Sequence, residues 1–403
     1  MKALVIGGSL GGLFAANLLH DLGWDVEVFE KVGDDLAARG AGIGTHRELV
    51  EVLAGLGISL SADLGAAVGD RVCVDKDDNL VHRAPWAHVM SAWANVYRPL
   101  KDRFPAERYH FGRGLVAFSE TPAGVVASFE DGSMATGDLL IGADGLRSTV
   151  RAQLFPGCEP RYGGYVAWRG LTEENLLSRE SRERLSDHYW FVLPRGEMIL
   201  CYVVPRLGMP GRREWNWVWY DPTTEAELAD LCTDASGRNH GIGIPPPLIR
   251  PEVIARIKEN ARTMLPPHMA EVITAGQPFF QSIFDVEAPR MAAGRACLLG
   301  DAAFVARPHV GMGVTKGALD AVCLAKSLKQ EISLEKALQR YDRLRSEFGR
   351  RVVARARRLG AFVEAVSRPE EKWSAEQLDQ SPQRLLREVA ASLSDIPELA
   401  LEI

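Results

Sequence analysis

The sequence predicts an α/β fold in which a parallel sheet opens the chain and a second, mostly antiparallel sheet follows it. The first 30 residues read as strand, glycine-rich turn, helix and strand, which is the pattern of a βαβ unit. Several apolar runs between residues 164 and 220 alternate like strands separated by turns. From residue 334 the chain reads as a charged amphipathic helix to its end.

The composition is that of a globular protein. The chain has 403 residues, 46% hydrophobic and 25% charged, which excludes a fibrous or wholly disordered chain. The formal net charge of −6 offers no basic excess for nucleic acid or an anionic membrane. No stretch reaches the ~20 uninterrupted apolar residues of a membrane span, because glycines cut the apolar start. Six scattered cysteines suit a reducing compartment, so we expect a cytoplasmic protein, and no metal-ligand spacing is visible.

The opening elements can be assigned one by one. Residues 2–6 form an apolar run typical of a strand buried on both faces. Residues 10–22 carry apolar side chains at helical spacing, and Gly23 is a suitable helix end. Residues 25–29 alternate as a second strand. Together they predict two parallel strands joined by a helix.

The turn between the first strand and the helix carries the first functional motif, Gly7-Gly8-Ser9-Leu10-Gly11-Gly12. Small residues at positions 7, 9 and 12 allow a pyrophosphate to approach the helix N-terminus. Glu30, at the end of the second strand, can accept hydrogen bonds from a ribose. The motif predicts a dinucleotide site, and the alternative is a merely structural turn.

The later elements follow from the same patterns. Residues 115–142 read as three strands separated by turns, and residues 256–265 read as a helix. In the run 215–220, three tryptophans fall on one face of a strand, and Tyr220 falls on the other. Residues 296–299 predict a buried strand, followed by a glycine-rich turn and a helix from about Val314. The arginine-rich stretch 338–358 is read as a solvated helix face, with a partner surface as the alternative.

Two later segments carry a family resemblance. Residues 137–151, GDLLIGADGLRSTVR, resemble the Asp-Gly motif of the flavoprotein aromatic hydroxylases, and residues 294–303 resemble their Gly-Asp motif. With the opening turn, the three motifs stand in family order and at family spacing, and the resemblance covers essentially the whole chain. The segments GGSLGGL, GYVAWRG and GDAAFVARPHVGMG are similar to the dihydroxypyridine hydroxylase branch of this family.

The resemblance implies a fold of the p-hydroxybenzoate hydroxylase type. It has a Rossmann-like FAD-binding domain, an inserted β-sheet substrate domain and C-terminal helices. The expected domains are 1–70, 98–162 and 280–335 for FAD, 71–97 and 163–279 for substrate, and 336–403 for the helical region.

The resemblance also implies an activity, namely that of an FAD-dependent monooxygenase using NADH or NADPH and O2. The substrate would be a small, electron-rich aromatic or N-heteroaromatic compound, similar to a hydroxypyridine. In the family cycle, O2 adds to the reduced flavin as a C4a-hydroperoxyflavin, and the distal oxygen goes to the ring. A homodimer would be in keeping with the family.

The motifs and the resemblance together give a set of cofactor contacts. In the family, the later aspartate contacts the ribityl chain, and the earlier one helps both cofactors bind. The expected FAD-binding residues are Gly7, Ser9, Leu10, Gly11, Gly12, Glu30, Lys31, Arg39, Leu115, Asp144, Asp301, Gly311, Gly313 and Val314. Phe304 and Met312 depart from the family's His and Gln, so we expect contacts from the backbone of residues 311–314 rather than from side chains.

Five residues are candidates for contacting the substrate. By the family pattern, Pro308 lies over the reacting edge of the flavin, with Arg307 and His309 beside it. His309 is a candidate general base, and Arg307 is a candidate partner for an anionic oxygen, although both could instead pin the turn. His46 is a candidate for facing the substrate, or else a loop histidine. Tyr220 and the nearby indoles could wall an aromatic pocket, or else belong to the core.

Three alternatives to this hydroxylase stay open. The first is the same flavin chemistry with a different outcome, such as decarboxylative hydroxylation, epoxidation or ring opening. The second is a reductase of the geranylgeranyl reductase type, which consumes no O2. The third is a non-catalytic GDI-like binding protein, against which the intact Asp144, Asp301 and glycine turns argue.

Overall fold

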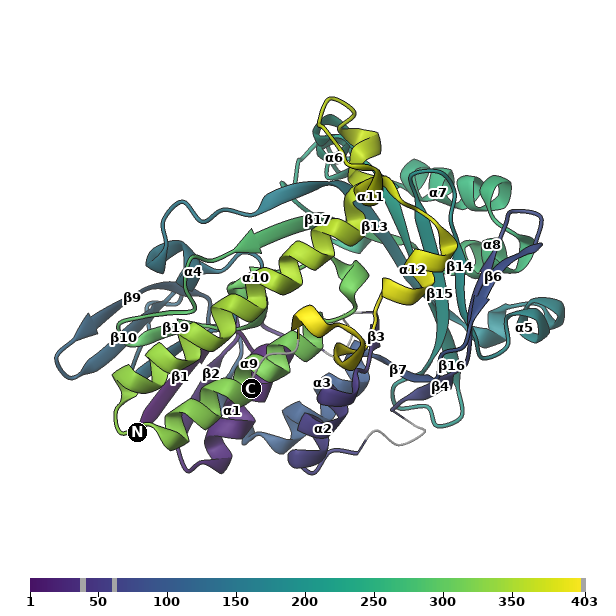
Figure 1. The fold of residues 1–403 in the computed structure, drawn as a ribbon. Helices are drawn as coiled ribbons and strands as arrows, with labels where there is room; N and C mark the ends of the chain where they lie inside the picture. The colour runs from purple at the N-terminus through teal and green to yellow at the C-terminus, as the bar shows by residue number, and fades with distance from the viewer. Residues whose placement is uncertain (37–40, 60–63, 400–403) are drawn as a thin grey trace.

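A computed structural model describes residues 1–36, 41–59 and 64–399. Two large sheets lie side by side, and the long helix α10 (Leu334–Ser367) crosses from one to the other (Figure 1). The six-stranded sheet has the order β18 (Ala292–Ala293), β19 (Ala296–Leu298), β12 (Leu139–Gly142), β1 (Lys2–Ile6), β2 (Asp25–Phe29), β8 (Tyr109–His110). Its pairs are parallel, except that β18 runs antiparallel to β19.

The second sheet has eight strands in the order β20 (Phe304–Val305), β17 (Phe279–Glu287), β13 (Arg161–Glu173), β16 (Arg213–Pro222), β15 (Met198–Pro205), β14 (Tyr189–Val192), β5 (Arg71–Val74), β6 (Leu80–Ala84). Only its β5–β14 pair is parallel among the described strands. Two small sheets are β11 (Met134–Gly137), β10 (Gly124–Phe129), β9 (Leu115–Thr121) and β3 (Gly42–Gly44), β7 (His88–Ala92), β4 (Ala66–Val68).

Helices cover the faces of these sheets (Figure 1). Besides α10 they are α1 (Leu10–Asp21), α2 (Arg47–Gly55), α3 (Trp93–Arg103), α4 (Thr149–Leu154), α5 (Arg179–Leu185), α6 (Glu225–Leu231), α7 (Pro251–Met264), α8 (Pro267–Ala275), α9 (Gly313–Gln330), α11 (Ala375–Leu378) and α12 (Pro382–Glu388). Within the described ranges, no helix is both long enough and apolar enough to cross a membrane.

The opening βαβ unit is confirmed. β1 and β2 occupy residues 2–6 and 25–29 and pair in parallel, while α1 ends at Asp21, just before Gly23. Gly7 has a φ of +103°, and a Cβ there would overlap the carbonyl oxygen of Ala143. The tight turn therefore requires glycine at this position, because an L-residue would be both strained and obstructed.

The alternation along β16 is confirmed, and it separates two environments. Trp215, Trp217 and Trp219 are buried in one apolar core with Ile257 of α7 and Val272 of α8. These indoles therefore belong to the core and do not wall a pocket. The opposite face of β16, which carries Tyr220, lines a cavity instead.

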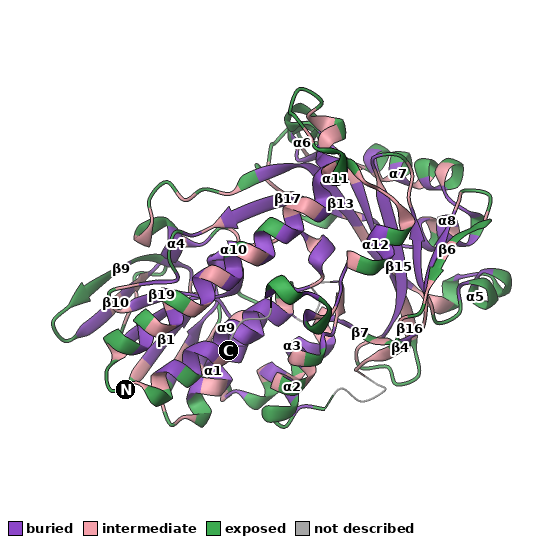
Figure 2. Cartoon of the chain, viewed as in Figure 1, coloured by how far each residue is buried: buried purple, intermediate pink, exposed green. Residues whose placement is uncertain are grey.

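The expectation of one helix from residue 334 to the end is wrong. α10 ends at Ser367, two residues before Pro369, because a proline disfavours helical backbone in the residue before it. The short helices α11 and α12 follow. Figure 2 shows the inner sides of α9 and α10 buried together with the strands of both sheets.

The arginines of α10 do not form a simple solvated face. Arg345 is buried, and its Nε donates to Oδ1 of Asp320 on α9 at 2.6 Å. Arg355 donates to Glu398 at 2.7 Å, and Arg357 donates to Asp285 of β17 at 3.1 Å. These arginines meet acids from other segments of the chain, which the sequence spacing does not reveal.

The domain boundaries stay a prediction. The strand order places β5 and β6 in the same sheet as β13 to β17. The predicted boundary at residue 280 falls inside β17, which pairs with β13.

We expect Arg345→Met to lower the free energy of unfolding by about 3 kcal/mol, because it leaves the buried Asp320 carboxylate without its main cationic partner. Arg343→Met, on an exposed position of the same helix, should change it by less than about 0.5 kcal/mol. Urea unfolding of the two variants and the wild type measures both values. Equal midpoints for all three would show that this ion pair does not hold α9 against α10.

Candidate active site

Two cavities lie where the strands of the six-stranded sheet end. This is the edge at which open α/β sheets bind their ligands. The first, the β1 cavity, has a volume of about 490 Å³. It is lined by Ile6, Gly7, Ser9, Phe29, Glu30, Lys31, Val32, Leu36, Trp93, Arg113, Gly114, Leu115, Glu130, Ala143, Asp144, Gly145, Arg147 and Thr149.

The N-terminus of α1 faces this cavity, and the N–H groups of its first three residues donate to no described residue. Ser9 precedes the helix in an extended conformation, and its side chain makes no capping hydrogen bond. The first turn carries no acidic residue. A Cβ at Gly12 would overlap the carbonyl oxygen of Gly7, so glycine there lets the helix pack closely against the turn. The first N–H groups of the helix are therefore available to a phosphate.

Glu30 braces the same turn. Its Oε2 accepts a hydrogen bond from the Gly8 N–H at 2.8 Å, and its Oε1 accepts one from the Val32 N–H at 2.9 Å. Each carboxylate oxygen has a second lone pair, so these bonds still leave acceptors for a ribose hydroxyl. Glu30 thus both shapes the β1 cavity and lines it.

Asp144 organises the opposite wall of the β1 cavity. It accepts hydrogen bonds from the Ser148 hydroxyl at 2.5 Å and from the N–H groups of Thr149 and Val150 at 2.7 and 3.2 Å. Burial raises the pKa of the carboxyl, and these hydrogen bonds oppose the rise. The residue therefore caps the start of α4 and orders the loop beside the cavity.

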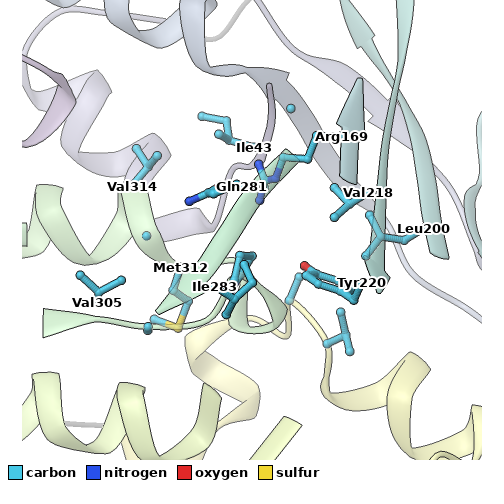
Figure 3. A pocket seen from close by; sticks show the side chains of 18 of the residues that line it. Ile43, Arg169, Leu200, Val218, Tyr220, Gln281, Ile283, Val305, Met312 and Val314 are labelled. Atoms are coloured by element: carbon cyan, nitrogen blue, oxygen red, sulfur yellow. The ribbon is translucent and has the colours of Figure 1, made fainter. Parts of the chain in front are cut away.

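The second, central cavity lies between the loops of the first sheet and the face of the second. Its volume is about 230 Å³. One wall consists of Gly42, Ile43, Gly44, Asp301, Val305, Ala306, Pro308, Gly311, Met312, Gly313 and Val314. The other includes Met90, Leu146, Arg169, Tyr189, Leu200, Tyr202, Val218, Tyr220, Gln281, Ser282, Ile283, Phe284, Val389 and Ala390. Figure 3 shows Met312 and Val314 on one side of this cavity and Val218 and Leu200 on the other.

Lys316 is a buried cation beside the central cavity. Its side chain is 1% exposed, and its Nζ lies 3.8 Å from Oδ1 of Asp301 and 3.8 Å from Oδ2 of Asp320. Among the described residues, Nζ has no hydrogen-bond partner. The Asp301 side chain is 52% exposed and faces the cavity. A buried ammonium with free donors beside a cavity-facing carboxylate suits the polar ribityl and phosphate groups of FAD.

Arg307 and His309 are brought close to the central cavity but do not line it. Arg307 is 2% exposed, and its Nη2 lies 2.8 Å from Asp285 and 2.6 Å from Glu364. Nε2 of His309 lies 2.8 Å from the hydroxyl of Tyr165, and its ring stacks on Tyr220 at 4.0 Å. The two neighbours of Pro308 therefore hold the loop, and the candidate substrate contacts are Pro308 and Tyr220.

His46 is likewise buried behind the wall. Its Nδ1 lies 3.0 Å from Oγ1 of Thr315 in the first turn of α9. Burial, reinforced by His88, lowers its pKa to about 4. The ring is therefore neutral at pH 7 and does not face the substrate side.

The predicted FAD-binding residues fall into three groups. Gly7, Ser9, Glu30, Lys31, Leu115 and Asp144 line the β1 cavity, and Asp301, Gly311, Gly313 and Val314 line the central cavity. Leu10, Gly11 and Gly12 belong to the first turn of α1, behind the lining residues. Arg39 lies outside the described residues.

Sequence reasoning missed Arg169 and Gln281. Arg169 lies on β13 in register with Val218 of β16, and both side chains face the central cavity. The available signal was a charged residue in the middle of the otherwise apolar strand GYVAWRGL. Gln281 lies on β17, directly opposite Ala167 of β13.

Comparisons with known proteins agree with this geometry. A family model described as FAD binding domain-like matches residues 162–285. The 2,6-dihydroxypyridine 3-monooxygenase of Paenarthrobacter nicotinovorans is 29% identical over 90% of this chain and 91% of its own. The structure of 2,6-dihydroxypyridine-3-hydroxylase from Arthrobacter nicotinovorans aligns with a TM-score of 0.86 at 29% identity, covering 90% of this chain and 92% of that one.

A second solved structure supports the fold. Klebsiella pneumoniae HpxO, crystallised with FAD and uric acid, aligns with a TM-score of 0.76 at 23% identity, covering 98% of this chain and 97% of the other. These likenesses confirm the predicted α/β fold with an inserted sheet.

We expect Lys316→Met to weaken FAD binding by roughly tenfold or more, because it removes a charged donor from beside Asp301. Titration of the apoprotein with FAD, followed by quenching of flavin fluorescence, measures the dissociation constant. Lys329→Met, at an exposed position of the same helix, is the matched control. An unchanged dissociation constant in Lys316→Met would remove Lys316 from the cofactor site.

We expect the protein to lose stability as the pH falls from about 6.5 towards 3. Burial lowers the pKa of His309 to about 3. Between pH 6.5 and 3 the unfolded chain therefore binds a proton at this residue that the folded chain does not bind, and this favours unfolding. His309→Phe should remove one proton from this slope. Urea unfolding at several pH values measures the slope, and identical slopes for His309→Phe and wild type would contradict the neutral, buried state.

Proposed function

We propose that the chain, which is similar to FAD-dependent monooxygenases over 90% of its length, hydroxylates a small, electron-rich aromatic or N-heteroaromatic ring with NADH or NADPH and O2. The protein is an oxidoreductase with FAD as its cofactor. The observation that supports the proposed substrate class is the central cavity, in which the loop of Pro308 to Val314 faces a wall with Tyr220, Arg169 and Gln281.

The protein's part is to bind the ring and exclude water. Bound FAD supplies the redox chemistry with O2. Apolar side chains, among them Leu200, Val218 and Ile283, surround the space in which the ring would lie. A wall that excludes water in this way suppresses hydrolysis of reactive intermediates and strengthens the few polar contacts inside the cavity.

The C-terminal segment completes this wall. Val389 and Ala390 line the central cavity. The Ala390 N–H donates to the carbonyl of His309 at 2.9 Å, and its own carbonyl accepts from Nη2 of Arg71 at 3.1 Å. Ala390 has a φ of +48°, which L-residues rarely adopt, so these bonds hold the segment against the Pro308 loop in spite of local strain.

The pocket residues receive separate roles in this proposal. Pro308 and Tyr220 contact the aromatic ring, because both line the cavity. His309 acts through Tyr220, against which its ring stacks. Its lowered pKa, about 3, makes it a poor base at neutral pH, so we propose it as a positioning residue rather than a proton acceptor.

The likeness to an enzyme named for 2,6-dihydroxypyridine favours hydroxypyridine-like rings as the first substrates to test. Purified FAD-loaded protein should oxidise NADH or NADPH with equal O2 uptake when a suitable hydroxypyridine or phenol is added. One hydroxylated product and one water should form per nicotinamide oxidised. Parallel measurement of nicotinamide absorbance, O2 and product tests this balance and identifies the preferred nicotinamide.

Two results would contradict the proposal. Flavin reduction without O2 uptake across the whole panel would favour a reductase. If the protein binds FAD but neither nicotinamide reduces the flavin in the presence of any ring, a non-catalytic binding protein is favoured. The same mixtures of nicotinamide and ring without enzyme are the control for non-enzymatic O2 consumption.

A further inference from the structure

Arg169 brings a positive charge into the central cavity, and it has no acidic partner among the described residues. It lies in the middle of β13, where Val218 and Phe279 occupy the paired positions on the neighbouring strands. Its Nε is buried and has no hydrogen-bond partner among the described residues. No carboxylate of the described chain forms an ion pair with its guanidinium, since none lies within 4.0 Å.

This situation is energetically costly for the protein alone. Arg169 is half-buried, and a guanidinium nitrogen that is drawn out of water without a hydrogen bond loses hydration that nothing replaces. The other charged residue of the cavity lining is Asp301, which pairs with Lys316 at 3.8 Å. No residue that lines the cavity therefore neutralises the positive charge of Arg169.

The tyrosines around Arg169 do not supply the missing anion. Burial raises the pKa of Tyr220 to about 12, and the charge of Arg169 only partly opposes this rise. Burial raises the pKa of Tyr202 as well. Both phenols are therefore neutral at pH 7. Figure 3 shows the guanidinium of Arg169 directed towards Gln281, with the hydroxyl of Tyr220 facing the same space.

We propose that Arg169 binds a carboxylate of the substrate, so that the ring enters the site as an anion. This inference rests on the proposed function, because it names the substrate class of the same cavity. The planar fork of a guanidinium matches the two oxygens of a carboxylate. The neutral donors and acceptors of Gln281 and Tyr220 complete the polar contacts of that edge.

The position of Arg169 also orients the ring. The charge lies on the β13 side of the cavity, whereas Pro308 and Gly311 lie on the cofactor side. Anchoring the acidic group at β13 therefore turns the opposite edge of the ring towards the Pro308 loop. Arg307 cannot take this role, because its guanidinium already pairs with Asp285 and Glu364.

The test is a binding measurement that needs no turnover. Oxidised, FAD-loaded enzyme is titrated with positional isomers of hydroxypyridine carboxylate and with the matching carboxamides, and the flavin absorbance change gives each dissociation constant. The acid and amide of each pair have similar shapes and differ in charge. At least one acid should bind wild type roughly tenfold or more tightly than its amide.

The variants assign this preference to one residue. Arg169→Gln should weaken binding of that acid by roughly 10- to 100-fold and leave the amide nearly unchanged. Arg169→Lys should recover part of the loss, because it keeps the charge without the fork. Arg161→Gln, at an exposed position of the same strand, is the matched control. FAD affinity should be equal in all four proteins.

Failure of this inference can be told apart from failure of the proposed function. The role of Arg169 is overturned if no acid binds wild type more tightly than its amide. It is also overturned if Arg169→Gln binds the acid and the amide with the same affinities as wild type. Either result holds whatever the turnover shows. If acids bind through Arg169 but no ring is hydroxylated with O2 uptake, the anion site stands and the proposed hydroxylation fails.

Discussion

The buried ion pairs of Arg307 hold the active-site region together. Asp285 on β17, Arg307 before the Pro308 loop, and Glu364 on α10 are far apart in sequence and almost completely buried. Arg357 of α10 and Arg368, which directly follows this helix, add contacts to Asp285 and Glu364 at 3.1 and 2.8 Å. Burying such charges is costly unless each is paired. The eight-stranded sheet, the Pro308 loop and α10 therefore have little freedom to move apart.

The shape of the central cavity follows from that arrangement. With Arg307 fixed, His309 two residues later stacks on Tyr220 and contacts Tyr165, so the loop lies directly against the sheet. The carbonyl of His309 then accepts the Ala390 N–H, which brings the C-terminal segment to the same place. Three distant parts of the chain thus form one water-excluding wall around the space between cofactor and sheet.

Local patterns were sufficient for the opening unit and for the faces of β16. The βαβ unit depends on a glycine turn, on helical spacing and on short apolar strands, all of which are visible within 30 residues. The alternation of Trp215 to Tyr220 likewise separated core from cavity, because the strand period needs no knowledge of the partner. The early end of α10 was missed, although Pro369 was visible in the sequence.

The charged residues were harder to assign, because the role of a charge depends on partners that are distant in sequence. Arg307 and Arg169 are the same residue type and lie near the same cavity, yet their surroundings give them opposite roles. Two carboxylates from β17 and α10 neutralise Arg307, which makes it part of the scaffold. Arg169 faces the cavity without such partners among the described residues, which makes it the group that a ligand can neutralise. Whether each charge is neutralised inside the fold, rather than its distance from a motif, therefore distinguishes the two arginines. Arg307 has a structural role, and Arg169 binds the substrate.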